Sequence, residues 1–364
     1  MKKILFVTPS LGFAGAAKML AFVANQLFLR GNEVHIANLN ITTDKVEQTV
    51  ESGIPIYNLY LGGHGMSKKL SAVKALAGYV RKNKIDVMVG FTMFPNFLDA
   101  AVQKITGIPA IMSERGDPNR TFGNDAVTKF IVSVIQGSSG AVFQTEGAGE
   151  YYSKRLKNRG VVIPNPIFIN EEIPSYIYTP ENKTVISLGR LDNTQKRYDV
   201  MLKAFAEVVE KHPEYILKIY GSGADEALII ALGKELKISR NIKLMGKTDA
   251  PLKAFSEGGI FLITSDYEGI SNSLLEAMAV GLPCVSTDHT PGGARLLIEN
   301  GINGLLAPVG DSSGLANAVC EFVEKPELAA KCGKNAKKVV DRFATDRIVD
   351  MWEKYIDEVC SKRR

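Results

Sequence analysis

The sequence predicts an α/β protein made of two doubly wound parallel-sheet domains in series. Its 364 residues are about twice the usual length of a domain, and 45% of them are hydrophobic. Short apolar runs alternate with segments of helical periodicity, which is typical of a parallel sheet covered by helices on both faces. This alternation is interrupted once, by a stretch rich in Pro and Asn at residues 164–182. We therefore expect domains at residues 1–168 and 169–345.

The first half contains the first series of strands and helices. Residues 4–8 form an apolar run, and a loop with two glycines leads into a helix over residues 16–30 that ends at Gly31. Further strands are expected at residues 33–39, 54–61, 85–91, 109–113, 140–144 and 161–164. Further helices are expected at residues 67–82, 95–106, 125–136 and 146–157.

The second half repeats the pattern. Strands are expected at residues 184–189, 216–221, 242–245, 260–264 and 283–286. Helices are expected at residues 198–211, 226–236, 250–256 and 272–281, with more helices up to residue 343. A last helix over residues 346–359 has one apolar face formed by Met351, Trp352, Tyr355, Ile356 and Val359. Two such halves are expected to face each other across a cleft, because ligands of these folds bind at the carboxyl ends of the strands.

Composition excludes several classes of protein. No window of 18 consecutive apolar residues is present, so no membrane-spanning helix is expected. The first apolar run, residues 4–7, is too short for a secretory signal, which favours a cytoplasmic protein. The cysteines Cys284, Cys320, Cys332 and Cys360 show no metal-ligand spacing, and the four histidines are scattered. We expect buried reduced thiols, with neither disulfides nor a structural metal.

Charge is distributed unevenly along the chain. Residues 1–170 contain 19 lysines and arginines against 11 aspartates and glutamates, whereas the remainder contains 25 against 28. A basic first half indicates contact with an anion or an anionic surface. No helix-turn-helix, zinc-finger or RNP-type segment is present, so nucleic acid is not the expected partner.

The most informative segment is residues 265–283, which follows an expected strand, turns at Gly269 and opens a helix. Ser271 or Asn272 is a suitable N-cap, and the free amide groups at a helix N-terminus bind phosphate. The residues expected to contact such a group are Gly269, Ile270, Ser271, Asn272 and Ser273.

Two carboxylates flank this helix start. Glu268 precedes it and Glu276 lies about one turn inside, at most roughly 12 Å apart if the whole stretch is helical. That separation is similar to the distance between the two sugars of a nucleotide diphosphate sugar. Glu276 could instead be a solvated helix carboxylate, but its neighbours Leu275, Ala277 and Met278 are apolar, which favours a bound partner.

Two cations could balance a diphosphate. Arg190 ends an expected strand and Lys196 precedes a helix, so both can face the ligand and stabilise charge on a departing phosphate. The alternative is that they are ordinary surface cations. Because no D-x-D pattern is present, we expect a site without a metal.

The combination of these segments resembles the retaining glycosyltransferases of family 4, which have the GT-B fold of two Rossmann-like domains. The resemblance covers nearly the whole chain. Its motifs are Glu268 to Glu276, Gly189-Arg190-Leu191 with Lys196, Tyr220-Gly221-Ser222-Gly223, Pro291-Gly292-Gly293-Ala294-Arg295, and Asn303-Gly304-Leu305-Leu306.

The resemblance implies that Glu268 contacts the donor sugar, Glu276 the ribose, and Arg190 and Lys196 the diphosphate. It implies an acceptor-side first domain, a nucleotide-sugar-binding second domain, and a last helix, 346–364, that crosses back to the first domain. Further donor contacts are expected at Gly15, Gly221, Gly223 and Lys247. No cofactor is expected besides the nucleotide diphosphate sugar as co-substrate.

The first domain departs from the family pattern. Many relatives have Gly-Gly-Ala-Glu where this chain has Ala14-Gly15-Ala16-Ala17, so the usual glutamate is absent. Many also have a histidine after the strand at residues 109–113, where this chain has Glu114 and Arg115. These two residues are expected to replace it in donor-sugar or acceptor contacts.

A basic helix offers a second acceptor-side surface. Residues 52–85 contain six basic residues and no acidic ones, and Lys68, Lys74 and Arg81 share the half of the helix opposite Leu70 and Val73. A solvated outer face is one interpretation. Contact with anionic lipid headgroups or a polyprenol pyrophosphate, at the inner face of the plasma membrane, is the other.

We therefore expect transfer of a sugar, with retention, from a UDP-linked donor to a hydroxyl of a glycan acceptor linked to polyprenyl diphosphate. A nucleotide-sugar epimerase or a phosphorylase of the same fold is an alternative. A non-catalytic sugar-binding protein of the periplasmic type is a further alternative, which the expected cation pair disfavours.

Overall fold

A computed structural model describes residues 1–364 except 13–14, 41–45, 47, 60–65, 168–171 and 363–364, and it leaves the side chains of residues 66–69 undescribed. The chain divides into two compact units. Unit 1 consists of Met1–Asn165 and Asp346–Arg364, and unit 2 of Pro166–Thr345. The division falls at Asn165, close to the expected boundary after residue 168.

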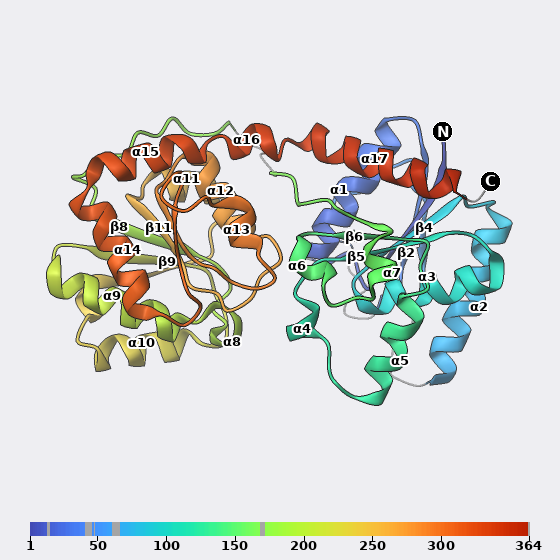
Figure 1. Cartoon of the computed structure of the whole chain (residues 1–364), viewed down its shortest axis with the longest axis horizontal. Helices are drawn as coiled ribbons and strands as arrows, with labels where there is room; N and C mark the ends of the chain where they lie inside the picture. The colour runs from blue at the N-terminus through green and yellow to red at the C-terminus, as the bar shows by residue number, and fades with distance from the viewer. Residues whose placement is uncertain (13–14, 41–45, 47, 60–65, 168–171, 363–364) are drawn as a thin grey trace. The chain divides into compact units, whose positions relative to one another are not determined.

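Unit 1 has an all-parallel sheet whose described strands lie in the order β3-β2-β1-β4-β5-β6-β7. Figure 1 labels β2, β4, β5 and β6 of this sheet. The strands are β1 (Lys3–Thr8), β2 (Glu33–Asn38), β3 (Ile56–Asn58), β4 (Val87–Phe91), β5 (Ala110–Glu114), β6 (Gly140–Phe143) and β7 (Gly160–Val162). The strand order reverses between β1 and β4, which is the place where sheets of this type bind ligands.

The helices of unit 1 follow the strands in alternation. They are α1 (Gly15–Leu29), α2 (Met66–Lys82), α3 (Met93–Thr106), α4 (Pro118–Thr121), α5 (Ala126–Ile135), α6 (Glu146–Gly149) and α7 (Lys154–Lys157). The prediction of a single helix at residues 146–157 is wrong. The segment forms two short helices, because Ser153 caps a new start by accepting a hydrogen bond from the Leu156 amide.

The last helix, α17 (Thr345–Ser361), packs on the sheet of unit 1. Trp352 is fully buried and stacks on Phe91 of β4, with ring centroids 5.8 Å apart. The hydroxyl of Tyr355 accepts a hydrogen bond of 2.8 Å from the Ala141 amide in β6. The terminal helix is therefore a structural part of the first domain, although it is last in the sequence.

Unit 2 has a second all-parallel sheet, whose described strands lie in the order β10-β9-β8-β11-β12-β13. The strands are β8 (Thr184–Leu188), β9 (Ile216–Tyr220), β10 (Ile242–Gly246), β11 (Ile260–Ile263), β12 (Cys284–Thr287) and β13 (Leu305–Ala307). The helices are α8 (Asn193–Lys196), α9 (Tyr198–Lys211), α10 (Glu226–Glu235), α11 (Pro251–Ser256), α12 (Asn272–Val280), α13 (Gly293–Leu297), α14 (Ser312–Glu324), α15 (Pro326–Ala336) and α16 (Val339–Arg342).

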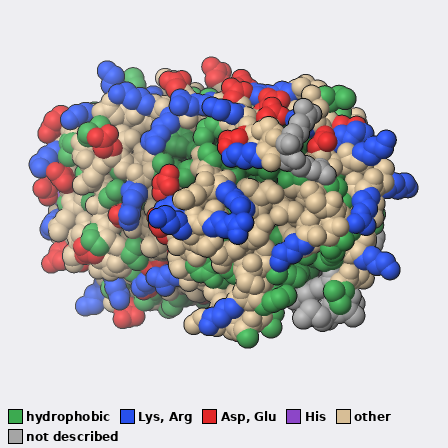
Figure 2. Space-filling model, turned by 45° about the vertical axis from the view of Figure 1, so that its right-hand side comes forward, with side chains coloured by type: hydrophobic (Ala, Val, Ile, Leu, Met, Phe, Trp, Pro, Cys, Tyr) green, Lys and Arg blue, Asp and Glu red, His purple; other side chains and the backbone are tan. Residues whose placement is uncertain are grey.

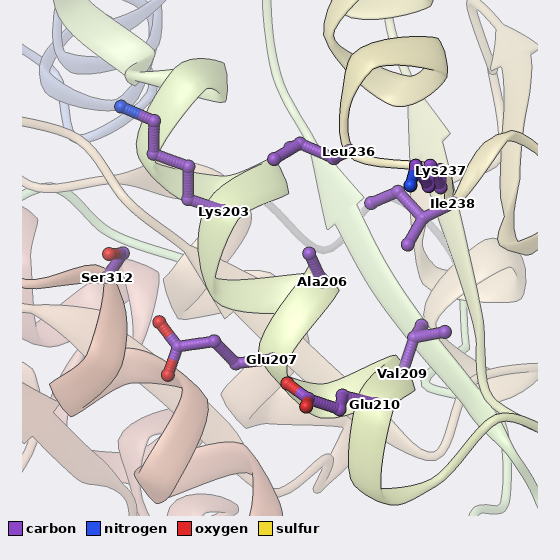
Figure 3. A pocket seen from close by; sticks show the side chains of 9 residues that line it. All are labelled: Lys203, Ala206, Glu207, Val209, Glu210, Leu236, Lys237, Ile238 and Ser312. Atoms are coloured by element: carbon purple, nitrogen blue, oxygen red, sulfur yellow. The ribbon is translucent and has the colours of Figure 1, made fainter.

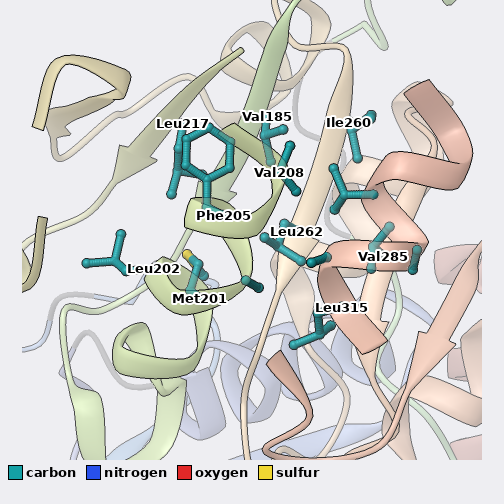
Figure 4. Close-up of a cluster of buried hydrophobic side chains, with 14 of the residues drawn as sticks. Val185, Met201, Leu202, Phe205, Val208, Leu217, Ile260, Leu262, Val285 and Leu315 are labelled. Carbon is teal, nitrogen blue, oxygen red and sulfur yellow. The ribbon is translucent and has the colours of Figure 1, made fainter. Parts of the chain in front are cut away.

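Both faces of this sheet are buried. Figure 4 shows one of them, where Phe205 of α9 and Leu315 of α14 cover Leu262 of β11. Ile186 of β8 faces the other cluster, together with residues of α11 and α12. Because side chains of a strand alternate between faces, burial on both sides requires the continuous apolar runs seen in the sequence.

The two domains are thus Rossmann-like, as the sequence predicts. Within the described residues, the search for a helix long and apolar enough to cross a membrane finds none.

Candidate functional site

A pocket of about 460 Å³ lies at the carboxyl ends of β8, β9 and β10 in unit 2. It is lined by Leu188, Gly189, Arg190, Tyr220, Gly221, Ser222, Lys247, Thr248 and Asp249. Three of the predicted donor contacts, Arg190, Gly221 and Lys247, are therefore brought together from three different strand ends. The two cations, Arg190 and Lys247, outnumber the one acidic residue in this lining, Asp249, which favours an anionic ligand.

The glycines of this region are required by close backbone contacts. Gly221 has φ of +143°, and a Cβ there would lie 1.8 Å from the carbonyl oxygen of Gly189. A Cβ at Gly223 would lie 2.2 Å from the carbonyl oxygen of Leu191, and Gly223 does not line the pocket. Gly223 therefore keeps two loops in contact, and its role as a donor contact stays a prediction.

Lys196 and Glu268 are hydrogen-bonded to each other through Nζ and Oε1. The side chains are 14% and 12% exposed. Ser265 donates a second hydrogen bond of 3.0 Å to the same carboxylate oxygen. A Cβ on Gly189 would lie 3.2 Å from Lys196 Cε, so this lysine runs along the backbone that lines the pocket. The pair therefore lies next to the pocket, although neither of its side chains lines it.

Electrostatics keep this carboxylate ionised. Burial alone would raise the pKa of Glu268, but the Lys196 ammonium and the hydrogen bonds outweigh it and lower that pKa. The sequence predicts both residues but assigns them to different parts of the ligand. Their direct ion pair is a property of the tertiary structure.

A network of polar contacts holds Lys196 in place. The Asp192 side chain caps α8 by accepting from the Thr194 amide at 3.0 Å, and Thr264 donates to the Lys196 carbonyl at 2.8 Å. Arg197, at φ of +53°, donates to both carboxylate oxygens of Asp266 at 2.9 Å. The lysine therefore stands on a short helix that is fixed at both ends, which preorganises its charge.

Arg190 is the more accessible of the predicted cations. Its guanidinium donates to Gln195 Oε1 at 3.0 Å and lies 3.2 Å from Asp192, while 65% of its side chain is exposed. It lines the pocket and is also largely in contact with solvent. The sequence left open whether Arg190 is a pocket cation or a surface cation. In the structure it is both, because it lines the pocket and is mostly exposed to solvent.

Helix α12 begins as the sequence predicts, with Ser271 as its N-cap. The hydroxyl of Ser271 accepts from the Leu274 amide at 3.4 Å. Residues 268–271 are not helical, so the separation of Glu268 and Glu276 does not follow helical rise over its whole length. Glu276 lies inside α12 and is half-buried among apolar neighbours.

His289 is a residue of this site that sequence reasoning missed. It follows β12, is fully buried, and has no hydrogen-bond partner on either ring nitrogen within the described residues. Burial lowers its pKa, and Glu268 and Lys196 are among the charges that act on it. The signal in the sequence was its place directly after a strand of a parallel sheet, beside the Gly292-Gly293 pair.

The loops around Glu268 are tightly joined. The Glu268 amide donates to the Thr290 carbonyl at 2.8 Å, and a Cβ on Gly293 would lie 1.7 Å from the carbonyl oxygen of Gly269. Thr287 donates to the Ser265 carbonyl at 2.6 Å. The loops after β11 and β12 therefore support the carboxylate together.

In unit 1, Glu114 is buried, and its carboxylate accepts hydrogen bonds from the loop that follows it. It accepts hydrogen bonds from the Tyr152 hydroxyl at 2.7 Å and from the amides of Arg115 and Gly116 at 2.9 and 3.1 Å. Burial raises the pKa of Glu114 despite these bonds. The acceptor role expected for this residue stays a prediction.

Arg115 is held against aromatic rings. Its guanidinium lies 5.2 Å from the centroid of Phe91 and 5.5 Å from that of Trp352, and it donates to Ser113 Oγ at 2.8 Å. Burial lowers the pKa of Arg115 to about 9. The first domain thus holds this guanidinium in a fixed position, and its expected contact with donor sugar or acceptor stays a prediction.

Gly15 opens α1 at an exposed position. A Cβ added to it would meet no described atom within 4 Å. Its expected approach to the donor phosphates stays a prediction, because no close backbone contact requires a glycine there.

The basic helix α2 differs from its expected orientation at one point. Lys74 and Arg81 are exposed, as expected, and Arg81 donates to the Ile105 carbonyl at 3.0 Å. Leu70, expected on the inner face, is 66% exposed, because Ala72, Val73 and Leu76 fill that face instead. The side chain of Lys68 lies outside the described residues. On the face drawn in Figure 2, Lys and Arg side chains are spread singly rather than gathered in one patch.

A second pocket, of about 570 Å³, lies beside α9 and the end of α10. Figure 3 shows Glu207 and Glu210 of α9 in its wall, with Ser312 at the start of α14 nearby. None of the predicted site residues lines it. Its position on the flank of unit 2 separates it from the strand ends that hold the Lys196–Glu268 pair.

Comparison with known proteins identifies relatives of the chain, and a family model that matches unit 2. Residues 169–339 match the model of the family described as glycosyl transferases group 1. An uncharacterized glycosyltransferase of Haemophilus influenzae is 26% identical over 357 residues, which is 97% of this chain and 99% of that protein. The poly(ribitol-phosphate) alpha-N-acetylglucosaminyltransferase of Staphylococcus aureus is 29% identical over 171 residues, 47% of this chain and 34% of that protein. The chain thus spans nearly all of the first relative but about a third of the second.

Solved structures share the two-domain architecture. Anabaena HepE in complex with UDP has a TM-score of 0.81 at 18% identity, covering 98% of this chain and 100% of that one. Staphylococcus aureus TarM, in complex with fondaparinux, alpha-GlcNAc-glycerol and UDP, has a TM-score of 0.76 at 16% identity, covering 98% and 100%. At these identities the likeness establishes the fold, which is GT-B. Residues 169–339 are therefore similar to the family of glycosyl transferases group 1, within a chain of GT-B fold.

Proposed function

We propose that this chain is a retaining, family 4 glycosyltransferase that moves a sugar from a UDP-sugar to a hydroxyl of a glycan acceptor. The observation that carries the proposal is the buried Lys196–Glu268 pair beside a pocket with two further cations, Arg190 and Lys247. The relatives are glycosyltransferases, and two of the similar structures contain UDP.

The cations supply what the leaving group needs. A departing UDP accumulates negative charge on its β-phosphate, and the donors of Arg190 and Lys196 stabilise that charge. On our proposal these two side chains and the start of α12 take the place of a metal ion. The amides at the start of α12 add a partial positive charge.

Glu268 holds the transferred sugar. Its carboxylate remains ionised because Lys196 and the hydrogen bonds lower its pKa against the effect of burial, so it can accept hydrogen bonds from sugar hydroxyls. Glu276, half-buried in α12, accepts from the ribose hydroxyls. In the transfer, the bond between the anomeric carbon and the phosphate oxygen breaks, the acceptor oxygen bonds to the same face, and its proton goes to the departing phosphate.

The experiment compares wild type with Glu268→Gln, using UDP release in the presence of acceptor. We expect turnover to fall at least about a hundredfold in the variant, because the sugar loses a charged hydrogen-bond acceptor at the reacting centre. Glu226→Gln, an exposed residue of α10, is the matched control and should retain full turnover. Full turnover in Glu268→Gln would refute the role of this carboxylate.

The same assay separates the alternatives. A nucleotide-sugar epimerase converts donor in the absence of any acceptor, and a phosphorylase needs inorganic phosphate. A non-catalytic sugar-binding protein would bind neutral sugar without nucleotide. Thermal-shift measurements with UDP, GDP and their common sugars identify the donor, because a bound ligand raises the melting temperature.

For the acceptor, we propose a glycan carried on polyprenyl diphosphate, with α2 contacting anionic headgroups at the inner face of the plasma membrane. Exposed Lys74, Arg81 and Leu70 on this helix support the proposal, since basic and apolar side chains together favour a membrane interface. Flotation with anionic vesicles should recover the wild type and lose it in Lys74→Glu/Arg81→Glu. Equal recovery of both proteins would contradict this part of the proposal.

A further inference from the structure

We propose that unit 2 contains a transition-metal site formed by His212, Cys320 and Glu324, which binds Zn²⁺. One potential ligand atom from each residue lies within 4.8 Å of the other two. This site is separate from the proposed sugar-transfer site. It also differs from the sequence-based expectation that the scattered histidines and cysteines form no metal site.

The three side chains come from the ends of two packed helices. His212 is the residue that follows the last turn of α9, and Cys320 and Glu324 lie one helical turn apart on α14. A hydrogen bond of 2.8 Å from Ser313 to Glu207 joins the same two helices near the start of α14. The two helices therefore hold the three ligands in a fixed relation.

The donor atoms are those that zinc prefers. A thiolate, an imidazole nitrogen and a carboxylate make three protein ligands, and a water can complete a tetrahedron. In such a site the ligand atoms lie roughly 3.5 Å apart, given Zn–S of about 2.3 Å and Zn–N of about 2.0 Å. His212 Nε2 is already 3.6 Å from Glu324 Oε1, so small side-chain rotations complete the site.

One ring nitrogen of His212 adds to this argument. His212 Nε2 is buried, yet it accepts or donates no hydrogen bond within the described residues. A buried polar atom that makes no hydrogen bond destabilises the folded state. The Glu324 carboxylate faces this nitrogen beyond hydrogen-bond distance, and a metal ion between the two would satisfy both.

Burial is graded across the site. Cys320 belongs to the hydrophobic core, whereas the Glu324 side chain is 57% exposed, so an ion can enter from solvent on the glutamate side. Burial raises the pKa of the Cys320 thiol; the charge of Lys211 opposes this rise, and Glu324 and Glu207 add to it. When the metal binds, the thiol loses its proton to solvent and the sulfur bonds to the ion.

The position suggests a structural role. Helix α9 starts near the carboxyl end of β8 and runs back, so His212 lies at the amino-terminal edge of the sheet, just before β9. The Lys196–Glu268 pair belongs to the opposite edge. A bound ion would therefore tie α9 to α14 and raise thermal stability without touching the donor.

The experiment titrates metal-free, full-length protein with Zn²⁺ against a chromophoric chelator, and with Co²⁺ as a spectroscopic probe. We expect one ion per chain, a rise in melting temperature with Zn²⁺, and a thiolate-to-cobalt charge-transfer band. Cys320→Ser should lose the band, and His212→Gln should weaken binding at least tenfold.

Cys360→Ser is the matched control, since this half-buried thiol lies on α17 outside the site. It should bind metal as the wild type does. No binding by the folded wild type, or a cobalt band that persists in Cys320→Ser, would overturn the proposal. Circular dichroism establishes that each variant is folded, and neither outcome depends on whether the chain transfers sugars.

Discussion

Lys196 and Glu268 are two charged side chains that the fold buries together. An ammonium and a carboxylate taken out of water are stable only while each compensates the other. Ser265 donates a further hydrogen bond to the carboxylate, and the cap at Asp192 holds the short helix that carries Lys196. The two side chains are thus held in fixed positions beside the proposed ligand site.

Replacing Lys196 by Met removes one half of this pair. We expect Lys196→Met to lower the free energy of unfolding by about 3 kcal/mol at pH 7, because Glu268 is left as an uncompensated buried carboxylate. Urea denaturation measures the change. The double variant Lys196→Met/Glu268→Gln should recover much of it, and an additive further loss would contradict the pairing.

The pH dependence has a defined sign. In the wild type the pKa of Glu268 is below its ordinary value, so its stabilising contribution is present above about pH 4.5 and is lost as the pH falls through the folded-state pKa. In Lys196→Met burial raises that pKa, so the variant gains relative stability as the carboxylate is protonated. The stability difference between the two proteins should therefore narrow on acidification below about pH 5.

At the scale of elements, the site depends on loops that approach one another closely at the strand ends. The loops after β11 and β12 meet where Gly293 faces the Gly269 carbonyl, and those after β8 and β9 meet at Gly189 and Gly221. Strands paired in parallel bring these loops to one edge of the sheet. A side chain in place of Gly293 or Gly221 would collide with a backbone carbonyl, which cannot move aside as a flexible side chain can.

A Gly293→Ala substitution tests this packing. The added Cβ would overlap the Gly269 carbonyl oxygen at 1.7 Å, so we expect a loss of at least about 2 kcal/mol in unfolding free energy and weaker UDP binding. Gly78→Ala, in the middle of α2 with nothing near its Cβ, should instead stabilise by about 0.5–1 kcal/mol. Unchanged stability in Gly293→Ala would mean that the two loops are not in contact.

At the scale of the whole molecule, the described residues form one parallel sheet in each unit, and the sequence contains one tryptophan. Trp352 is buried in unit 1 against Phe91, although it lies in the last helix of the sequence. Its fluorescence therefore reports on unit 1. The proposed nucleotide site lies in unit 2.

This arrangement predicts a selective effect of ligand. UDP should raise the melting temperature of the unit 2 transition, measured by calorimetry, while the tryptophan fluorescence transition shifts less. Trp352→Phe should lower the unit 1 transition, because a fully buried indole is replaced by a smaller ring. Equal shifts of both transitions with UDP would show instead that the units unfold together.

Much of the fold could be predicted from the sequence. The helix over residues 198–211 is found with those bounds, and α12 is capped by Ser271, one of the two predicted caps, because periodicity and capping are local properties. The helix expected at 146–157 is wrong because two good N-caps, Thr145 and Ser153, compete there. The short helix α8 is not predicted, since four residues carry no measurable period.

The sequence by itself determined two doubly wound domains, the segment that carries Glu268 and Glu276, and the two cations Arg190 and Lys196. Periodicity, caps and glycines are encoded locally, so they can be read without coordinates. Only the tertiary structure decided that Lys196 pairs with Glu268, that His289 lies buried beside them, and that His212 meets Cys320 and Glu324. These contacts join residues far apart in the chain, and no local pattern specifies which distant side chains the packing of a sheet brings together.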